Sequence, residues 1–219
     1  LGALLLLALP STLQAGVLER VEASGVLRAG TRADVAPFAF LDQGGNPVGF
    51  SVDLLDEIRA ALSERFGRTI ALDLSVVTTT NRIDAVESGD LDIICEVTTP
   101  TWDREEHVDF SLPFFRDGTR VLAFRETLNS VSELQDMTIG VAEGTTTAAI
   151  LGETVPGIET RTYPSMDATF AALRRGEVQG VANVGVILLG LSRQLTPDQS
   201  VVLLPRTEPL GSETMACIL

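Results

Sequence analysis

The chain has 219 residues, 45% of them hydrophobic, and a formal net charge of −14. This length allows one or two domains, and the apolar content is enough for a sizeable buried core, which excludes a disordered chain. The negative charge argues against nucleic acid and anionic membrane surfaces as partners, although clustered arginines can still hold an anion inside an acidic protein.

Residues 1–16 are typical of the remnant of an export signal. An apolar run at residues 4–9 is followed by Pro, Ser, Thr and Ala within residues 10–15, as in a signal peptide and its cleavage region, and it is too short to span a membrane. No Met or basic segment precedes it, so we expect the true start to be missing. The alternative is a buried apolar segment. The signal interpretation predicts a periplasmic protein that begins near Gly16.

Short β-branched runs alternate with amphipathic segments along the rest of the chain. In residues 53–66 apolar side chains recur at helical spacing, with Asp53 expected as the cap and Gly67 as the end. Alternating strands and helices predict an α/β architecture with mostly parallel sheets. Further helices are expected at residues 81–88, 145–151 and 165–175, and strands at residues 26–30, 70–77, 92–97, 120–124, 138–141, 178–182 and 201–204.

Two segments are expected to cross between two lobes. Residues 110–118, which contain Pro113 and three phenylalanines, lie between two α/β blocks, and a second crossing is expected near residues 208–217. The predicted lobe 1 comprises residues 17–112, with residues 216–219 returning to it, and lobe 2 comprises residues 113–215. Because such a chain normally adds a helical tail after its return, we expect the sequence to stop early at Leu219.

The two cysteines, Cys95 and Cys217, allow two interpretations. In an exported protein they can form a disulfide, which by chain entropy would contribute about 4 to 5 kcal/mol. The alternative is two unpaired buried thiols. No zinc-binding spacing is present and His107 is the one histidine, so neither a metal nor a cofactor is expected.

Four segments resemble the periplasmic amino-acid-binding proteins of ABC transporters, solute-binding protein family 3. They are GTRADVAPFAF (30–40), GFSVDL (49–54), NRIDAVESGDLDIICEVTTPTWDREEHVDFSLPFF (81–115) and IGVAEGTTTAAIL (139–151). Arg32, the Asn81-Arg82-Ile83 triplet and the cysteine before Thr98-Thr99 resemble the glutamate/aspartate branch. The resemblance implies the type II periplasmic-binding-protein fold, with two lobes closing over an amino acid. It also implies a monomer that delivers its ligand to the membrane subunits of an ABC transporter.

Two positions are suited to the α-carboxylate of an amino acid. Arg104 follows the strand that ends near Thr99, at the edge where α/β sheets place their ligands. A guanidinium group and hydroxyls suit a carboxylate, and the resemblance gives these roles to Arg104 and Thr99. Thr145 and Thr146 open a helix, whose N-terminus attracts anions. The alternatives are a surface salt bridge for the arginine and an ordinary helix cap for the threonines.

Arg32 and Arg82 distinguish the acidic branch. The resemblance implies that they hold a side-chain carboxylate, with Thr79 nearby. Together with Arg104 they would place three buried cations in one cleft, which need anions for neutralisation, and a dianionic ligand would supply them. The alternative is that Arg32 and Arg82 pair with carboxylates such as Asp34 at the surface.

The sequence also departs from the family pattern. Val184, preceded by Asn183, stands where the resemblance expects an aspartate for the ligand's ammonium, and Glu96 stands where the branch usually has glycine. Three explanations are open: Glu96 replaces that aspartate, the ligand lacks an ammonium, or the site is degenerate. We therefore count Glu96 among the expected ligand contacts, with Phe38 and Asn183 as further candidates.

The preferred interpretation is capture of an acidic amino acid or related dicarboxylate for ABC-type import, without catalysis. One alternative is the ligand-sensing extracellular domain of a signalling receptor. A second is a lyase or dehydratase on the same fold, for which Glu96 would be the acid or base because a carboxylate in a cleft can have a raised pKa.

Overall fold

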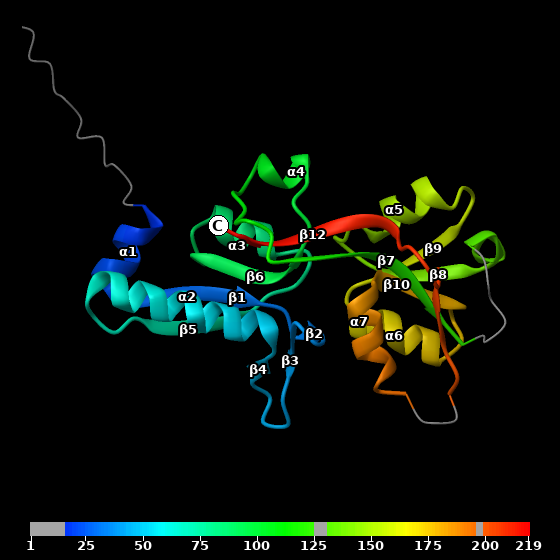
Figure 1. Cartoon of the computed structure of the whole chain (residues 1–219), viewed down its shortest axis with the longest axis horizontal. Helices are drawn as coiled ribbons and strands as arrows, with labels where there is room; N and C mark the ends of the chain where they lie inside the picture. Colours follow the sequence, from blue (N-terminus) through cyan, green and yellow to red (C-terminus); the bar gives the residue numbers. More distant parts are fainter. Residues whose placement is uncertain (1–15, 125–130, 196–198) are drawn as a thin grey trace, which may run out of the picture.

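The computed structural model describes residues 16–124, 131–195 and 199–219. Figure 1 shows two α/β lobes joined by two long strands, β7 (Phe115–Ala123) and β12 (Leu210–Ile218). One path of strands runs through both lobes in the order β5-β1-β6-β12-β7-β10-β8-β9, and β11 also pairs with β7. The expected mixed α/β fold with a mostly parallel sheet is confirmed. The expected lobe bounds stay a prediction.

Lobe 1 contains a parallel three-stranded core to which β12 returns. β1 (Val26–Thr31) pairs in parallel with β5 (Ala71–Val76) and with β6 (Ile93–Thr98), and β12 runs antiparallel to β6. The helices are α1 (Val17–Ser24), α2 (Phe50–Phe66), α3 (Arg82–Glu87) and α4 (Trp102–Glu105). A small second sheet is formed by β2 (Asp34–Val35), β3 (Ala39–Leu41) and β4 (Pro47–Val48).

Lobe 2 repeats this arrangement with β7 as its antiparallel member. β10 (Gly180–Val184) pairs with β7 and, in parallel, with β8 (Thr138–Ala142), which pairs in parallel with β9 (Glu159–Tyr163). β11 (Val202–Leu204) runs antiparallel to β7. The helices are α5 (Thr147–Thr154), α6 (Met166–Arg174) and α7 (Gly185–Ser192), with a 3₁₀ turn at Val131–Asp136.

The largest apolar cluster extends from one lobe to the other. Val35, Phe38 and Ala39 of lobe 1 belong to the same buried cluster as Phe170 and Leu188 of lobe 2. Burial of apolar side chains stabilises the packing by about 25 cal/mol per Å² removed from water. The segment after β1 therefore holds the two lobes against each other.

Two local expectations are wrong. Helix α2 begins at Phe50 after Gly49, so Asp53 lies inside the helix and is not its cap. Gly49 has φ 122°, and a Cβ there would lie 2.6 Å from the Phe38 carbonyl oxygen, so glycine is required at this start. Helix α5 begins at Thr147, two residues later than expected.

Cys95 of β6 and Cys217 of β12 form a disulfide across 122 residues of sequence, so of the two alternatives the structure contains the bonded pair. The bond ties the returning strand to lobe 1. The expected signal remnant lies outside the described residues, apart from Gly16. No helix in the described ranges is both long and apolar enough to cross a membrane.

Candidate ligand-binding site

Arg32 directly follows β1 and is 3% exposed. Its Nε donates to Asp34 Oδ1 at 2.9 Å, and its Nη1 lies 3.9 Å from Glu96 Oε2. Nη2 lies 2.7 Å from Asp34 Oδ1 but is not aligned with it, so this buried nitrogen has no hydrogen-bond acceptor in the described structure. Arg32 does pair with Asp34, as one alternative proposed, but in the interior and not at the surface.

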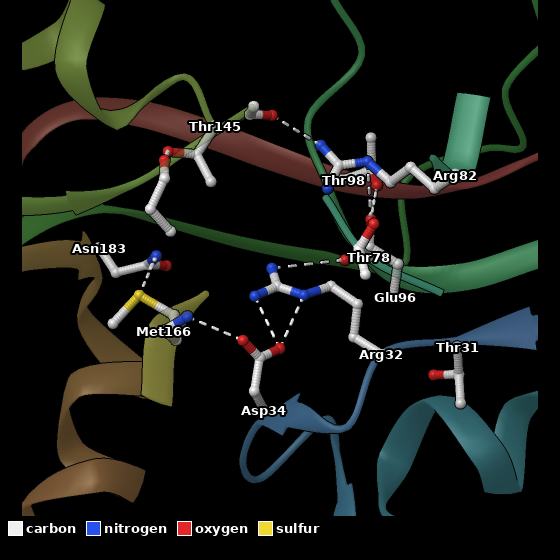
Figure 2. Close-up of polar contacts among 12 residues, drawn as sticks. Thr31, Arg32, Asp34, Thr78, Arg82, Glu96, Thr98, Thr145, Met166 and Asn183 are labelled. Atoms are coloured by element: carbon white, nitrogen blue, oxygen red, sulfur yellow. Dashed lines mark hydrogen bonds and ion pairs between the residues drawn. The ribbon is translucent and has the colours of Figure 1, made fainter. Parts of the chain in front are cut away.

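Arg82 is the first residue of α3 and is 2% exposed. Its Nη2 donates to the Gly144 carbonyl at 3.0 Å, and its Nε lies 3.3 Å from Glu96 Oε1. Nε and Nη1 have no hydrogen-bond acceptor among the described atoms. Burial lowers the pKa of Arg82, Glu96 opposes that effect and the neighbouring Arg32 adds to it. Figure 2 shows Arg32 and Arg82 approaching Glu96 from separate elements.

Glu96 of β6 is fully buried between these two arginines. Its Oε1 accepts a short hydrogen bond from the Thr98 hydroxyl. The residue that the sequence suggested as an ammonium partner is thus already paired with cations, and it is not among the residues that line the central cavity.

Arg104 of α4 reaches across to lobe 2. Its Nη1 donates to the Thr99 carbonyl at 2.5 Å and its Nη2 to the Gly144 carbonyl at 3.0 Å. Burial, followed by the positive charge of Arg82, lowers the pKa of Arg104 to about 10. No ion pair with its neighbours Asp103 or Glu105 is found in the described chain.

The turn before α5 brings lobe 2 to these arginines. Gly144 has φ 68°, and a Cβ there would lie 2.8 Å from the Thr79 carbonyl oxygen, so glycine permits the close approach of the lobes. The Thr145 hydroxyl donates to the Ala142 carbonyl at 2.7 Å, and the Thr146 hydroxyl makes a short hydrogen bond to Glu213. Neither threonine acts as a side-chain cap of α5.

Glu213 of β12 is the residue that sequence reasoning missed. It is 3% exposed and accepts hydrogen bonds from Thr99 Oγ1 at 3.0 Å, from Thr119 Oγ1 at 2.8 Å and from Thr146. The signal in the sequence is an acidic residue two positions before the apolar run 215–219, inside the expected second crossing.

A narrow cavity lies where these groups meet. Its volume is about 20 Å³, which is room for about one water molecule. It is lined by Arg32, Arg82, Val97, Thr99, Arg104, Thr145, Thr146, Thr147, Asn183, Val184 and Glu213.

The expected contacts Asn183, Thr79 and Phe38 lie in three different surroundings. Asn183 lines the cavity, but its amide is held by Met166 Sδ at 3.0 Å and by the Val184 backbone N–H at 2.8 Å. Thr79 is buried and lines an adjoining pocket with Arg32. Phe38 lines neither, because its ring packs in the apolar cluster between the lobes.

The two lobes are in contact on either side of the cavity. The Met166 backbone N–H of lobe 2 donates to Asp34 Oδ2 of lobe 1 at 2.8 Å. A Cβ on Gly190 of α7 would lie 2.8 Å from the Ala36 carbonyl carbon, so the helix packs against the backbone of the turn between β2 and β3. Together with the contacts at Gly144, these contacts show that the two lobes are closed against each other.

The expectation that three buried arginines need a dianionic ligand for neutralisation is wrong. Asp34 and Glu96 are ion paired with the arginines, and Glu213 raises the pKa of Arg104 through its charge. Three carboxylates therefore accompany the three arginines, and a dianionic ligand is not needed for neutrality.

Two lobes hinged on crossing strands around a buried polar cavity define a periplasmic binding protein of type II. The chain belongs to the bacterial extracellular solute-binding proteins, family 3, whose family model matches residues 27–193.

Relatives within this family differ in the ligand that their names give. The chain is 27% identical over 180 residues to the glutamine-binding protein of Geobacillus stearothermophilus, covering 81% of this chain and 68% of that protein. It is 32% identical over 140 residues to the L-glutamate/L-aspartate-binding protein of Pseudomonas aeruginosa, covering 62% of this chain and 46%, about half, of that protein. The cysteine-binding protein of Campylobacter jejuni superposes with a TM-score of 0.81 at 27% identity, over 94% of this chain and 80% of its own.

Proposed function

We propose that this chain captures an acidic amino acid in the periplasm, as a monomer, and delivers it to the membrane subunits of an ABC importer. Membership in the solute-binding family and the two-lobe fold support capture and delivery. The observation that supports the acidic ligand is the set of buried, unsatisfied guanidinium nitrogens: Nη2 of Arg32 and Nε and Nη1 of Arg82.

An unsatisfied buried donor costs about 1 to 3 kcal/mol, more when it is charged. A carboxylate offers two oxygens and about four acceptor positions, so one side-chain carboxylate would satisfy these nitrogens together. A neutral amide offers a single acceptor oxygen. The hydrogen-bond deficit, and not the net charge, therefore favours glutamate or aspartate over glutamine.

The α-carboxylate has its own position in the proposal, between Arg104 and the Thr145–Thr146 turn. Burial beside Arg82 lowers the pKa of Arg104, which means that the charged guanidinium is disfavoured where it lies. An anion beside it offsets that cost. Each charge-assisted hydrogen bond contributes roughly 1.5 to 3 kcal/mol, so a few of them reach micromolar affinity, about −8 kcal/mol, after ordering costs.

The ligand would act by bridging the lobes. The cavity of this closed arrangement, about 20 Å³, is too small for an amino acid, so in the proposal a ligand carboxylate replaces the Gly144 carbonyl as the acceptor for Arg82 and Arg104 and the lobes stand slightly further apart. Such bridging contacts exist only when the lobes are close together. A ligand with such differential contacts shifts the population toward the closed form.

We further propose that the site performs no catalysis. Glu96, the one acid considered for that role, is hydrogen bonded by Thr98 and lies between Arg32 and Arg82. A general acid or base must reach the reacting atom, and Glu96 does not line the cavity.

A thermal-shift screen followed by calorimetry tests the proposal. Glutamate and aspartate are expected to raise the melting temperature and to bind at micromolar affinity, because a ligand of the folded state stabilises it. A larger shift with arginine, cysteine or glutamine than with glutamate would contradict the acidic assignment.

A variant pair makes the screen specific. Arg82→Met removes the buried guanidinium and should weaken the binding of glutamate much more than the binding of glutamine. Arg175→Met is the matched control, because Arg175 is 57% exposed and pairs with Glu177 at the surface of lobe 2. Equal losses for the two ligands in Arg82→Met would count against a role for Arg82 in side-chain recognition.

A further inference from the structure

Glu213 is a buried carboxylate for which the described structure provides no ion-pair partner. Its side chain is 3% exposed, yet no lysine or arginine nitrogen lies within 4.0 Å of it in the described residues. The arginines that share its cavity are engaged elsewhere: Arg82 and Arg104 donate to the Gly144 carbonyl, and Arg32 pairs with Asp34. The charge of Arg104 acts on Glu213 from a distance, but no cation contacts the carboxylate, and a buried charge without a direct partner is costly, so this position favours a cation.

Three hydroxyl groups fix the orientation of the Glu213 carboxylate. Thr99 of lobe 1 and Thr146 of lobe 2 donate to Oε1, and Thr119 of β7 donates to Oε2. A carboxylate has about four acceptor positions, so one remains on Oε2 after these three bonds. Donors from both lobes and the hinge meet at this residue only when the lobes are together.

Other groups at the cavity do not offer a carboxylate. Val184, at the start of α7, has an apolar side chain, and the Asn183 oxygen accepts from the Val184 N–H. Glu96 is paired with arginines and lies outside the lining. Of the described residues that line the cavity, Glu213 is the only one with an acidic side chain.

We propose that Glu213 receives the α-ammonium group of the ligand. This inference rests on the proposed function and narrows it: the ligand must have an ammonium group next to its α-carboxylate, which excludes simple dicarboxylates. With the carboxylate held at Arg104 and the ammonium at Glu213, the hinge strand itself contacts the ligand. Ligand binding would therefore act directly on β12, one of the two strands that connect the lobes.

Calorimetry with two matched ligand pairs tests the assignment. Glutamate and glutarate differ by the ammonium group, as do aspartate and succinate. In Glu213→Gln the affinity for glutamate should fall about 30-fold or more, the usual effect of removing one partner of a buried charge pair. The affinity for glutarate should stay unchanged or rise. Glu96→Gln is the comparison variant, and the melting temperature of each protein without ligand reports on folding.

The outcomes separate this inference from the proposed function. If the wild-type protein binds glutamate but Glu213→Gln binds it equally well, the assignment of Glu213 is overturned and the proposed function stands. If Glu96→Gln shows the selective loss instead, Glu96 is the ammonium partner and the inference is again overturned. Should Glu213→Gln fail to fold, the wild-type protein still decides: glutarate binding as tightly as glutamate overturns the inference, and a strong preference for glutamate supports it.

Discussion

Replacing Gly190 by alanine should hold the two lobes apart. In the closed arrangement the new Cβ would lie 2.8 Å from the carbonyl carbon of Ala36 on the other lobe. Carbon atoms in contact prefer about 3.5 to 4.0 Å, so α7 must retreat by about 1 Å. Overpacking of this kind costs about 1 to 3 kcal/mol, and because only the closed form has the contact, the dissociation constant should rise about 5- to 150-fold.

The helix itself should not suffer from the change. Alanine is favoured over glycine in a helix interior by about 1 kcal/mol, so unliganded Gly190→Ala should unfold at or above the wild-type temperature. Gly152→Ala is the matched control, because Gly152 lies in α5 and a Cβ there meets no atom within 4 Å. The control gains the same helix propensity without obstructing the lobes.

Calorimetry with glutamate and small-angle scattering measure the two consequences. Gly190→Ala should bind more weakly and stay more extended than wild type at saturating ligand, while Gly152→Ala should match wild type in both. Wild-type affinity together with wild-type compaction in Gly190→Ala would show that closure does not bring α7 against Ala36.

Three further changes test other parts of the structure. Burial raises the pKa of Asp92, but hydrogen bonds from Arg28 and Arg20 outweigh this effect, so the pKa is lowered. Asp92→Asn should therefore lower the free energy of unfolding by about 2 kcal/mol at pH 7. A carboxylate with a lowered pKa stabilises the folded protein above its unfolded pKa, and this contribution is lost on acidification. In urea titrations the difference in free energy of unfolding between wild type and Asp92→Asn should therefore shrink between roughly pH 5 and pH 2. A difference that stays constant with pH would contradict this. Replacing Cys95 and Cys217 together by serine should cost about 4 to 5 kcal/mol, since the bond closes a loop of 122 residues, and an unchanged melting temperature would argue against the bond. Arg104→Lys should weaken ligand binding about tenfold or more in calorimetry, since lysine lacks the planar fork of donors, and wild-type affinity would place the carboxylate elsewhere.

The sheet elements of this fold could be predicted because their sequence pattern matches their burial. β6 is buried on both faces and carries an apolar or β-branched run interrupted only by Glu96, and in α2 apolar residues recur at helical spacing. The short strands β2, β3 and β4 could not be predicted, because two or three residues are too few to show an alternating pattern. Helix α7 was missed because it is apolar on nearly every side and shows no helical alternation.

The convergence of the three arginines could be predicted, while their role as ligand contacts stays a prediction. Arg32, Arg82 and Arg104 line one cavity, as expected from the resemblance. The carboxylates that pair with these arginines could not be assigned, because the sequence does not show whether an acidic residue is exposed to water or buried beside a cation. Glu213 is buried only because β12, β7 and the turn before α5 meet around it, and that convergence is a property of the tertiary fold.

A crystal structure of the complex with glutamate would locate both carboxylates of the ligand. We expect one glutamate between the lobes, with its side-chain carboxylate within hydrogen-bond distance of Arg32 and Arg82 and its α-carboxylate on Arg104. Glutamate bound outside this cavity, or in it with neither carboxylate on these guanidinium groups, would contradict the proposed function.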